Sequence, residues 1–496
     1  MKSSAVRIEA ALYLGFDVGT QSTKAVVLDA STGTVVARAQ CAYDLLPGLP
    51  PGHQEQHPDT WIAAVQATAR QVLQGVDASR IQGIGVSGQQ HGCVVLDEHA
   101  QVVRAAKLWC DTSTATEARA LSQQLGRLVP TGFTASKLVW LRAHEPQNWA
   151  RVRTVLLPHD FVNLRLCGTA TMECGDASGT GFFDPVARGF DALAMRAIDP
   201  RLAAMLPPLV RPGAPAGRLS SAGALLLGLP EGVPVSHGGG DNMMAAIGSG
   251  AAANGVAVVS LGTSGTVFAR SDSPVVDPGG LIAPFCSSDG AYLPLLCVMN
   301  LTGVTESVCR LTGLTHAELT QRASAVPIGS DGLTWLPFLN GERVPDLPDA
   351  NGTLLAMRSD NLTPGHVYRA ALEGTSCNLA HGARRLQQLG VPLRELRLCG
   401  GAASNVLWRQ ILADLLEVPV AVVEEPEAAA LGAAIQALWT VRRLAGERAS
   451  CAEVAAPFVR TTGELVRPSR DLAASRALRA RFARELLRHH GVRLLD

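Results

Sequence analysis

Apolar and polar positions alternate in short blocks at the start of the chain. Residues 11–18 (ALYLGFDV) form a nearly continuous apolar run, residues 19–22 are polar or Gly, and residues 23–28 are again mostly apolar. Short apolar runs bounded by Gly, Ser and Thr predict buried strands joined by tight turns. A further strand is expected near 34–39, so the chain is predicted to open as a β-meander.

Two other segments have the helical period. An apolar stripe runs along residues 58–73 and is formed by Trp61, Val65, Thr68 and Val72. Pro58 stands where helices often begin, so a helix is predicted there. Residues 364–389 show the same period over a longer stretch. The Arg-rich residues 471–487 predict a terminal helix, for which a solvated face is favoured over a binding role.

One local pattern occurs twice, which suggests two halves of related construction. A strand, a turn of Gly, Thr and Ser, and a second strand are found near residue 18 and again near residue 262. The similarity is one of pattern and not of identity. Strand and helix signals alternate between the two copies, which predicts an α/β architecture. We expect two domains, residues 1–248 and 249–496.

Composition narrows the class of protein. The 496 residues are 47% hydrophobic and 17% charged, as in globular chains that form more than one domain. The formal net charge is zero, so neither nucleic acid nor an anionic membrane is an expected partner. The 11 cysteines include no C-x-x-C pair and no metal-binding spacing, which favours buried reduced thiols.

The beginning of the chain does not have the pattern of a signal peptide. Lys2 and Arg7 are basic, but Glu9 follows at once and Asp17 interrupts the short apolar run. No stretch of about 18 or more apolar residues is present, so no transmembrane helix is expected. A cytoplasmic location is therefore predicted.

The first candidate site is the hairpin from Asp17 to Lys24, with the sequence DVGTQSTK. Backbone N–H groups near Gly19, the Thr20 hydroxyl and the Lys24 ammonium group can together bind phosphate. The carboxylate of Asp17 can hold a hydrated Mg²⁺. An ordinary β-hairpin is the alternative, since Gly and Ser are common in turns.

A second turn favours the phosphate interpretation. Gly262, Thr263 and Ser264 have the same chemical groups in the second half of the chain. Two such turns facing each other could bind a polyphosphate from both sides. The chain has no G-x-x-x-x-G-K-[ST] loop, and no strand leads through G-x-G-x-x-G into a helix, so neither a Walker A nor a Rossmann site is expected.

A third segment, LCGGAASN, predicts a nucleoside site. Gly400 and Gly401 follow a predicted strand, and a helix is expected to start near Asn405. Without Cβ atoms, the two glycines could let a base or ribose lie against the backbone. A plain strand-to-helix turn is the alternative.

A fourth segment, GGGDN, carries a candidate general base. Phosphoryl transfer to an alcohol needs a group that accepts the hydroxyl proton, and Asp241 stands on a glycine-rich turn between the two halves. Asp241 could instead be the N-cap of a helix over 243–247, and both roles are compatible.

A fifth segment, SGQQHG, offers groups that could bind the hydroxyls of a sugar. Gln90 and His91 follow a predicted strand, although a lone His is more often structural. Trp109 could add a stacking face, and Asp111 another acceptor.

In this order, the five segments resemble the FGGY carbohydrate kinases of the actin/hexokinase superfamily. The resemblance runs from about Leu12 to Trp439. DVGTQSTK and LGTSGT look like the family's two phosphate loops, and GGAASN looks like its adenosine loop. PGHQEQHPDTW is similar to an early family motif. SGQQHG, GGGDN and WLPFLNGERVPD look most like the members that phosphorylate D-xylulose.

The resemblance implies two ribonuclease-H-like, actin-like ATPase domains with a catalytic cleft between them, ATP and Mg²⁺ as donor and cofactor, and D-xylulose 5-phosphate as product. It implies that Asp241 is the base and shares Mg²⁺ with Asp17. Sugar-binding residues would be Gln90, His91, Trp109, Asp241 and Asn242. Nucleotide-binding residues would be Asp17, Gly19, Thr20, Lys24, Gly262, Thr263, Ser264, Gly400, Gly401 and Asn405. Family members are often dimers.

Three positions depart from the family pattern. Gln90 stands where Met is usual, Ser113 where Arg is usual, and His57 where Asp is usual. A longer polar side chain at Gln90 could meet another hydroxyl, so a different ketose or polyol is an alternative substrate. A nucleotide-binding actin-like protein without sugar chemistry is a further alternative, disfavoured by Asp241 and the SGQQHG segment.

Overall fold

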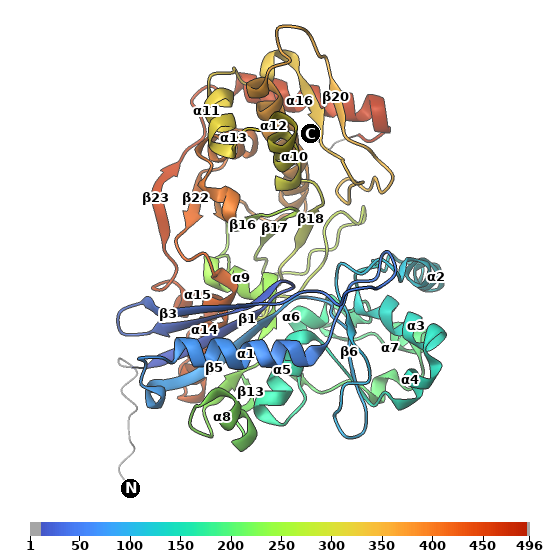
Figure 1. Cartoon of the computed structure of the whole chain (residues 1–496), viewed down its shortest axis with the longest axis vertical. Coiled ribbons are helices and arrows are strands. Elements are labelled where there is room, and N and C mark those ends of the chain that lie inside the picture. Colours follow the sequence, from blue (N-terminus) through green and yellow to red (C-terminus); the bar gives the residue numbers. More distant parts are fainter. Residues whose placement is uncertain (1–10, 494–496) are drawn as a thin grey trace.

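A computed structural model describes residues 11–493 and shows two α/β lobes, each built on a mixed sheet (Figure 1). Lys2, Arg7 and Glu9, on which the expectation about a signal peptide rests, lie outside the described residues. No helix within residues 11–493 is long and apolar enough to cross a membrane. All eleven cysteines lie in this part of the chain and are unpaired.

The first sheet has the strand order β13-β14-β5-β1-β2-β3, and β15 also pairs with β5. Its strands are β1 (Leu12–Val18), β2 (Ser22–Asp29), β3 (Thr34–Ala42), β5 (Ile81–Gly88), β13 (Pro215–Arg218), β14 (Pro234–Ser236) and β15 (Gly239–Gly240). The strands β1, β2 and β3 pair antiparallel, as the predicted meander requires. β1, β14 and β15 each run parallel to β5.

The second sheet repeats this plan with the order β18-β17-β16-β21-β22-β23. Its strands are β16 (Val256–Leu261), β17 (Gly265–Ala269), β18 (Leu295–Val298), β21 (Glu395–Cys399), β22 (Val420–Val423) and β23 (Thr461–Val466). An antiparallel meander is again followed by two parallel strands on the far side of its first strand. The repeat confirms the predicted class of two ribonuclease-H-like, actin-like domains.

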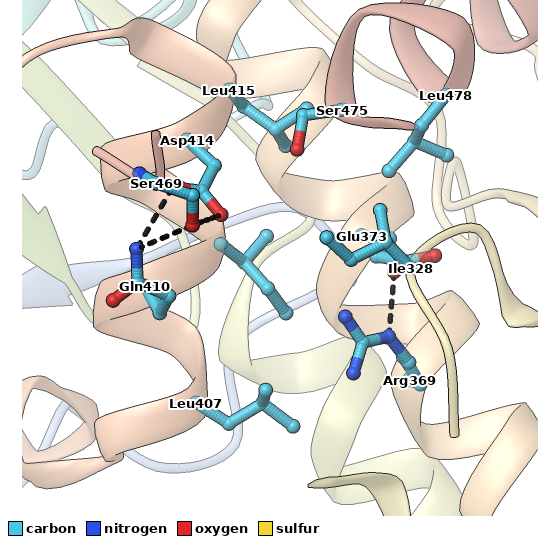
Figure 2. A pocket seen from close by; sticks show the side chains of 11 residues that line it. Ile328, Arg369, Glu373, Leu407, Gln410, Asp414, Leu415, Ser469, Ser475 and Leu478 are labelled. Carbon is cyan, nitrogen blue, oxygen red and sulfur yellow. Dashed lines mark hydrogen bonds and ion pairs between the residues drawn. The ribbon is translucent and has the colours of Figure 1, made fainter. Parts of the chain in front are cut away.

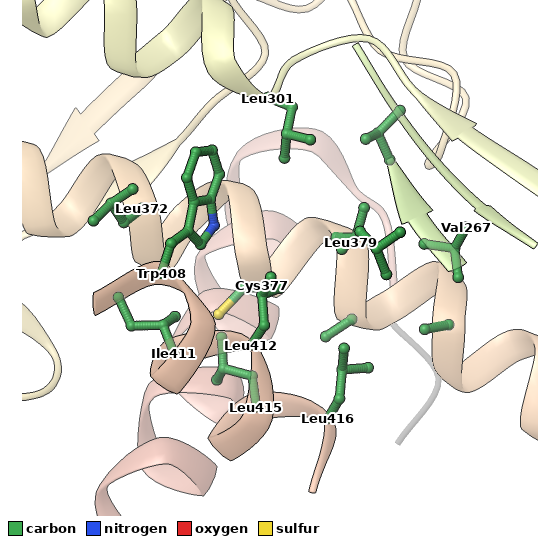
Figure 3. Packing of buried hydrophobic residues seen from close by; sticks show 14 of the residues in the cluster. Val267, Leu301, Leu372, Cys377, Leu379, Trp408, Ile411, Leu412, Leu415 and Leu416 are labelled. Carbon is green, nitrogen blue, oxygen red and sulfur yellow. The ribbon is translucent and has the colours of Figure 1, made fainter. Parts of the chain in front are cut away.

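The predicted helices form with bounds close to those expected. They are α1 (Pro58–Val72), α12 (Pro364–Gln388) and α16 (Ala473–His490). The predicted stripe of α1 is buried. α12 is buried on nearly every side, because it lies at the centre of the second lobe. Figure 3 shows Leu372 and Leu379 of α12 packed with Trp408 of α13 (Val406–Leu416) in this core. α16 buries one narrow stripe and exposes the rest.

Smaller elements complete both lobes. In the first half they are β4 (Glu55–Gln56), β6 (Val94–Leu96), β7 (Ala106–Lys107), α2 (Ala115–Leu125), α3 (Thr134–His144), α4 (Pro146–Arg151), β8 (Thr154–Leu156), α5 (Pro158–Cys167), β9 (Met172–Glu173), α6 (Cys174–Ala177), β10 (Phe183–Asp184), β11 (Gly189–Phe190), α7 (Ala192–Ile198), β12 (Leu209–Val210) and α8 (Ser221–Leu227). In the second half they are α10 (Thr302–Thr312), α11 (His316–Ser324), β19 (Thr334–Leu336), β20 (Thr353–Leu355) and α15 (Cys451–Ala455).

Two helices join the lobes. α9 (Asp241–Ser249) follows the first sheet, and α14 (Ala428–Leu444) comes from the second half but packs against α9, β1 and β5 of the first lobe (Figure 1). A Cβ on Gly432 of α14 would lie 1.9 Å from the Met244 carbonyl oxygen. Glycine therefore allows the two helices to approach this closely. The boundary between residues 248 and 249 stays a prediction.

Candidate active site

Strand register brings the predicted phosphate hairpin and the predicted base together. Asp17 on β1 is paired with Ser87 on β5, and Ser87 is paired with Gly239 on β15. These three strands are parallel, so the residues that follow them emerge at one edge of the sheet. The edge therefore carries the hairpin turn after Val18, the SGQQHG segment and Asp241, and ligands of open α/β sheets bind at this kind of edge.

The hairpin turn is fixed from behind by side chains. The Tyr43 hydroxyl donates to the Gly19 carbonyl oxygen at 2.7 Å, and Gln56 Nε2 donates to the Thr20 carbonyl oxygen at 2.6 Å. Thr20 Oγ1 donates to Gln89 Oε1 at 2.9 Å. The carbonyl groups of Gly19 and Thr20 are thus hydrogen-bonded to side chains of the protein, and these bonds hold the backbone of the turn in one conformation.

Both charged ends of the hairpin already have partners. Ser87 Oγ donates to Asp17 Oδ1 at 2.8 Å. Burial raises the pKa of Asp17, and the bond from Ser87 and the charge of Lys24 oppose that rise. Lys24 Nζ lies 2.6 Å from Glu427 Oε2, immediately before α14. Glu427 carries no motif in the sequence, and only tertiary structure brings it to the hairpin.

Asp241 is the first residue of α9, and Gly240 is its N-cap. The alternative prediction of Asp241 as the cap is therefore wrong by one residue. Burial raises the pKa of Asp241 to about 8, and the charges of Asp17 and Asp176 add to the rise. Asn242 opposes it, because its backbone N–H and its Nδ2 donate to Asp241 Oδ1 at 2.8 and 3.0 Å. Such a shifted carboxyl group is typical of a catalytic acid or base.

Asn242 connects Asp241 to both lobes. Its Nδ2 also donates to Gln90 Oε1 at 2.8 Å, and its Oδ1 accepts a long hydrogen bond of 3.4 Å from Thr266 Oγ1 on β17. Gln90 is buried, and its Nε2 forms no hydrogen bond within 3.5 Å among residues 11–493. Burial raises the pKa of Asp176, and the nearby Gln90 side chain opposes that rise. The structure thus brings together three of the predicted sugar-site residues: Gln90, Asp241 and Asn242.

His91 stands beside them with a strained backbone. Its φ of 63° lies in the left-handed region, and its carbonyl oxygen accepts a 2.6 Å bond from Lys137 Nζ. The ring packs on Phe133 and Phe285 with centroid distances of 4.7 and 5.8 Å. Burial holds the pKa of His91 well below its ordinary value, so the imidazole is neutral at pH 7. Its Nδ1 has no partner in the described part of the chain.

A buried charged group that the sequence did not reveal lies behind this site. His159 Nδ1 lies 3.0 Å from Asp176 Oδ2, and His159 Nε2 lies 2.9 Å from Asp160 Oδ1. Burial alone would lower the pKa of His159, but the two carboxylates hold it well above its ordinary value. A Cβ on Gly240 would lie 3.1 Å from Asp176 Oδ1, so this group supports the turn that carries Asp241.

Trp109 is placed at the hairpin. Its Nε1 donates to Thr20 Oγ1 at 3.0 Å, so the indole N–H is already bound. Stacking of this ring on a sugar stays a prediction.

Asp111 does not face a polyol, because it is buried and is bonded to Lys107 Nζ at 3.2 Å. Lys107 Nζ also lies 3.2 Å from His53 Nδ1 and 3.0 Å from Glu55 Oε1. His53, Glu55 and Asp111 are close enough to ligate a metal ion. The lysine ammonium group already supplies the cation among them, so the cluster is an ion-pair network.

The second predicted phosphate turn joins β16 to β17. Its carbonyl groups are bound at the start of α10, where Thr302 N donates to Gly262 O at 3.0 Å and Leu301 N donates to Thr263 O at 3.1 Å. The hydroxyls of Thr263 and Ser264 form no hydrogen bond within residues 11–493, and Thr263 is exposed. These hydroxyls are therefore available to a ligand, and their contact with phosphate stays a prediction.

The third segment lies next to that turn, but its glycines differ in role. Gly400 has φ of 93°, and a Cβ there would lie 2.6 Å from the Leu261 carbonyl oxygen. It therefore serves the close approach of β21 to β16, whereas a Cβ on Gly401 would meet nothing within 4 Å. Asn405 caps α13, since its Oδ1 accepts from Trp408 N at 3.1 Å. Its Nδ2 donates to Thr320 Oγ1 at 3.0 Å, so direct nucleoside contact by this side chain stays a prediction.

A cavity of about 120 Å³ lies elsewhere in the second lobe, between α12, α13 and α16. Figure 2 shows its polar lining paired within the protein, with Arg369 bound to Glu373 and Gln410 bound to Asp414. None of the predicted site residues lines it. Its lining therefore gives no reason to place the chemistry there.

Comparison with known proteins identifies the family. Residues 12–248 match the N-terminal domain of the FGGY family of carbohydrate kinases, and residues 257–441 match its C-terminal domain. The chain belongs to this family. Xylulose kinase of Haemophilus influenzae is 41% identical over 446 residues, which cover 86% of this chain and 90% of that one. Xylulose kinase of Streptomyces coelicolor is 39% identical over 444 residues, which cover 86% and 88%.

Solved structures agree with the family. The crystal structure of xylulose kinase from Rhodospirillum rubrum superposes with a TM-score of 0.87 at 26% identity, over 97% of this chain and 99% of that one. The crystal structure of glycerol kinase from Plasmodium falciparum has a TM-score of 0.85 at 18% identity, over 97% and 98%. At that identity, the second likeness shows the shared FGGY fold alone. The chain is thus a two-domain FGGY carbohydrate kinase.

Proposed function

We propose that this kinase transfers the γ-phosphoryl group of ATP to a hydroxyl group of D-xylulose and produces D-xylulose 5-phosphate and ADP. The observation that carries the proposal is the position of Asp241, a carboxyl group of raised pKa at the sheet edge that also bears the Asp17–Lys24 hairpin. The names of the similar kinases support the choice of sugar.

In this proposal Asp241 is the general base. It accepts the hydroxyl proton as the sugar oxygen bonds to the γ-phosphorus, and the bond from phosphorus to the leaving oxygen of ADP breaks. Gln90, His91 and Asn242 orient the sugar, and Trp109 contacts it from the edge of the site. Asn242 also fixes the direction of the Asp241 carboxylate through two hydrogen bonds.

ATP binds between the two sets of turns in this proposal. The first set is Gly19, Thr20 and Lys24, the second is Gly262, Thr263 and Ser264, and the nucleoside lies near Gly400, Gly401 and Asn405. Asp17 and Asp241 suit Mg²⁺, because their oxygens are hard ligands and the charge of Asp17 raises the pKa of Asp241. When bound, Mg²⁺ supplies positive charge to the phosphates. Asp17 retains its orientation through Ser87.

A substrate panel tests the function. We expect ADP release with D-xylulose to exceed that with D-ribulose, L-xylulose, D-fructose, glycerol and xylitol by at least about tenfold in kcat/KM. A ratio of this size is expected because a wrong sugar leaves buried polar groups of the pocket without hydrogen bonds, which raises the free energy of the transition state. If another compound is preferred, the sugar is wrong and the kinase assignment stands. If none accelerates ADP release, the chain is the non-catalytic nucleotide-binding protein of the alternative prediction.

Gln90 favours the second candidate, an FGGY kinase for a different ketose or polyol. Its buried Nε2 forms no hydrogen bond within 3.5 Å among residues 11–493. Burial raises the pKa of the nearby Asp176 and the Gln90 side chain opposes that rise, so a substrate hydroxyl would compete with Asp176 for this donor. Comparison of Gln90→Met with the wild type over the same panel tests this candidate. A change of preferred substrate supports it, and an unchanged order of substrates argues against it.

The homodimer that family members suggest is tested by light scattering of the purified chain. The cytoplasmic location is part of the same proposal.

A further inference from the structure

Arg343 is an exposed side chain in the segment WLPFLNGERVPD, between β19 and β20. Among residues 11–493, it takes part in no ion pair within 4 Å. The proposed function gives it no role, although the segment belongs to the second lobe and its charge acts on His91 in the first. A guanidinium without an ion-pair partner among residues 11–493, whose charge acts on a residue of the other lobe, is suited to bind an anionic ligand.

The backbone at Arg343 is held firmly by its neighbour. Glu342 is buried, and its Oε1 accepts from Met299 N at 2.6 Å and from Arg343 N at 2.8 Å. Its Oε2 accepts from Asn300 Nδ2 at 3.0 Å and from Asn378 Nδ2 at 3.3 Å. Glu342 thereby ties the loop to the end of β18 and is saturated by these amide donors.

The anchored loop lies close to Asp241. Thr266 on β17 donates to Asn242, and Thr266 is paired across the sheet with Cys297 on β18. Burial raises the pKa of the Cys297 thiol, whereas the charge of Arg343 and its hydrogen bond to the sulfur oppose that rise. The guanidinium therefore contacts Cys297, one strand away from the residue that bonds Asn242.

The charges around the reaction explain why an arginine is needed there. Asp17 and Asp241 are acidic, and the transferred group is itself an anion. Lys24 is paired with Glu427, so part of its charge is neutralised. The positive charge of Arg343 acts on His91, beside which the sugar is proposed to lie, and Glu342 holds the loop next to the residues that bind the turn at 262–264.

We propose that Arg343 binds the phosphoryl group as it is transferred and after it has become the phosphate of the sugar. This inference rests on the proposed function. The sugar oxygen bonds to the γ-phosphorus, its proton goes to Asp241, and ADP leaves with the bridging oxygen. The phosphoryl oxygens then lie on the sugar side, where the planar guanidinium can bind two of them with parallel hydrogen bonds.

The test compares two ligands that differ only by the phosphate. Isothermal titration gives the Kd of D-xylulose and of D-xylulose 5-phosphate for the wild type, Arg343→Gln and Arg343→Lys. Arg310→Gln is the matched control, because Arg310 is an exposed arginine on α10 of the same lobe and loses the same charge. Turnover of the four proteins is measured in parallel.

For Arg343→Gln we expect the Kd of the sugar phosphate to rise tenfold or more, the Kd of the sugar to change less than twofold, and kcat to fall at least tenfold. The values for Arg343→Lys should lie between those of the wild type and Arg343→Gln. Lysine retains the positive charge but lacks the planar guanidinium that can form two parallel hydrogen bonds. The control should match the wild type.

An equal rise in the Kd of both ligands in Arg343→Gln would overturn the inference, because Arg343 would then contact the sugar and not its phosphate. Unchanged values in Arg343→Gln would overturn it as well. If Arg343→Gln does not fold, the same two comparisons are made with Arg343→Lys. Should the panel identify another sugar, that sugar and its phosphate replace the two ligands, so failure of the sugar assignment is separate from failure of this inference.

Discussion

At the scale of single residues, the proposed mechanism depends on the ionisation of Asp241. A base must be ionised to accept a proton, yet burial and the charges of Asp17 and Asp176 raise the pKa of Asp241 to about 8. Without ligands, only about a tenth of the molecules carry the ionised form at pH 7. In the proposed mechanism a divalent cation at Asp17 and Asp241 would favour the ionised carboxylate, so binding of Mg·ATP and activation of the base would be coupled.

The first prediction concerns pH. Asp241 is active when ionised, and its pKa is raised, so activity is lost as pH falls through about 8. With ATP held well below its KM, we expect kcat/KM to decrease about tenfold per unit below that pH. At saturating Mg·ATP the acid limb should move to lower pH. Initial rates between pH 5.5 and 9 measure both profiles, and a flat profile would contradict the assignment of the base.

The second prediction is the loss of the base. Asp241→Asn retains the shape of the side chain and removes its ability to accept a proton, so kcat should fall by about 10²–10⁴. Nucleotide binding should persist, because the hairpin and the second-lobe turns are unchanged. Turnover is measured by ADP release and ATP binding by titration. Activity near that of the wild type would exclude Asp241 as the base.

At the scale of elements, the packing of α14 on α9 fixes the position of Asp241. Asp241 begins α9, and Gly248 near its end contacts α14 so closely that a Cβ would lie 1.9 Å from the Ala428 carbonyl oxygen. Gly432 makes the reciprocal approach to Met244. Backbone atoms cannot move aside as a flexible side chain can, so both positions require glycine.

The third prediction follows from this contact. In an open helix Gly→Ala would stabilise by roughly 1 kcal/mol. Gly432→Ala should instead destabilise the first lobe by at least about 1–3 kcal/mol, because the methyl group overlaps the backbone of α9. Gly189→Ala is the control, since a Cβ there meets nothing within 4 Å. Thermal unfolding of both variants measures the difference, and equal midpoints would contradict the packing argument.

At the scale of the whole molecule, two ion pairs connect the opening meander, at β2 and β3, to the residues just before α14. Lys24 is paired with Glu427 at 2.6 Å, and Arg38 with Glu425 at 2.5 Å. The partners are nearly 400 positions apart in the sequence. The hairpin is thus attached to the helix that joins the lobes, and in the proposed mechanism Lys24 would divide its charge between Glu427 and a nucleotide.

The fourth prediction uses that competition. Glu427→Gln should lower the KM of ATP by up to about fivefold, the range of a partly exposed ion pair, because Lys24 is released to the phosphates. Lys24→Gln should raise it. Steady-state kinetics at saturating sugar measure both. A higher KM in Glu427→Gln would mean that the pair positions the hairpin and does not compete with ATP.

The positions of the candidate site segments at strand ends could be predicted from local sequence. The hairpin at Asp17, the turn at Gly262, the Gly400 turn and Asp241 all lie where apolar runs end, and strand ends are where open sheets place ligands. The repeated strand-turn-strand pattern also sufficed to predict two related lobes. The strands, the turns and the two lobes could be predicted because hydrophobic period and turn chemistry are local properties of the chain, whereas the ligand contacts of these segments stay predictions.

The remaining features depend on contacts between distant segments, which no local pattern reports. Glu427 reaches Lys24 only because α14 crosses to the first lobe, and His159 meets Asp176 only within the buried core. Gly400 looks like a ligand contact in sequence, yet its missing Cβ serves the approach to Leu261. The sequence by itself determined which groups are present and which strand ends carry them. Tertiary structure decided their charge state and partners, because burial and long-range pairing set both.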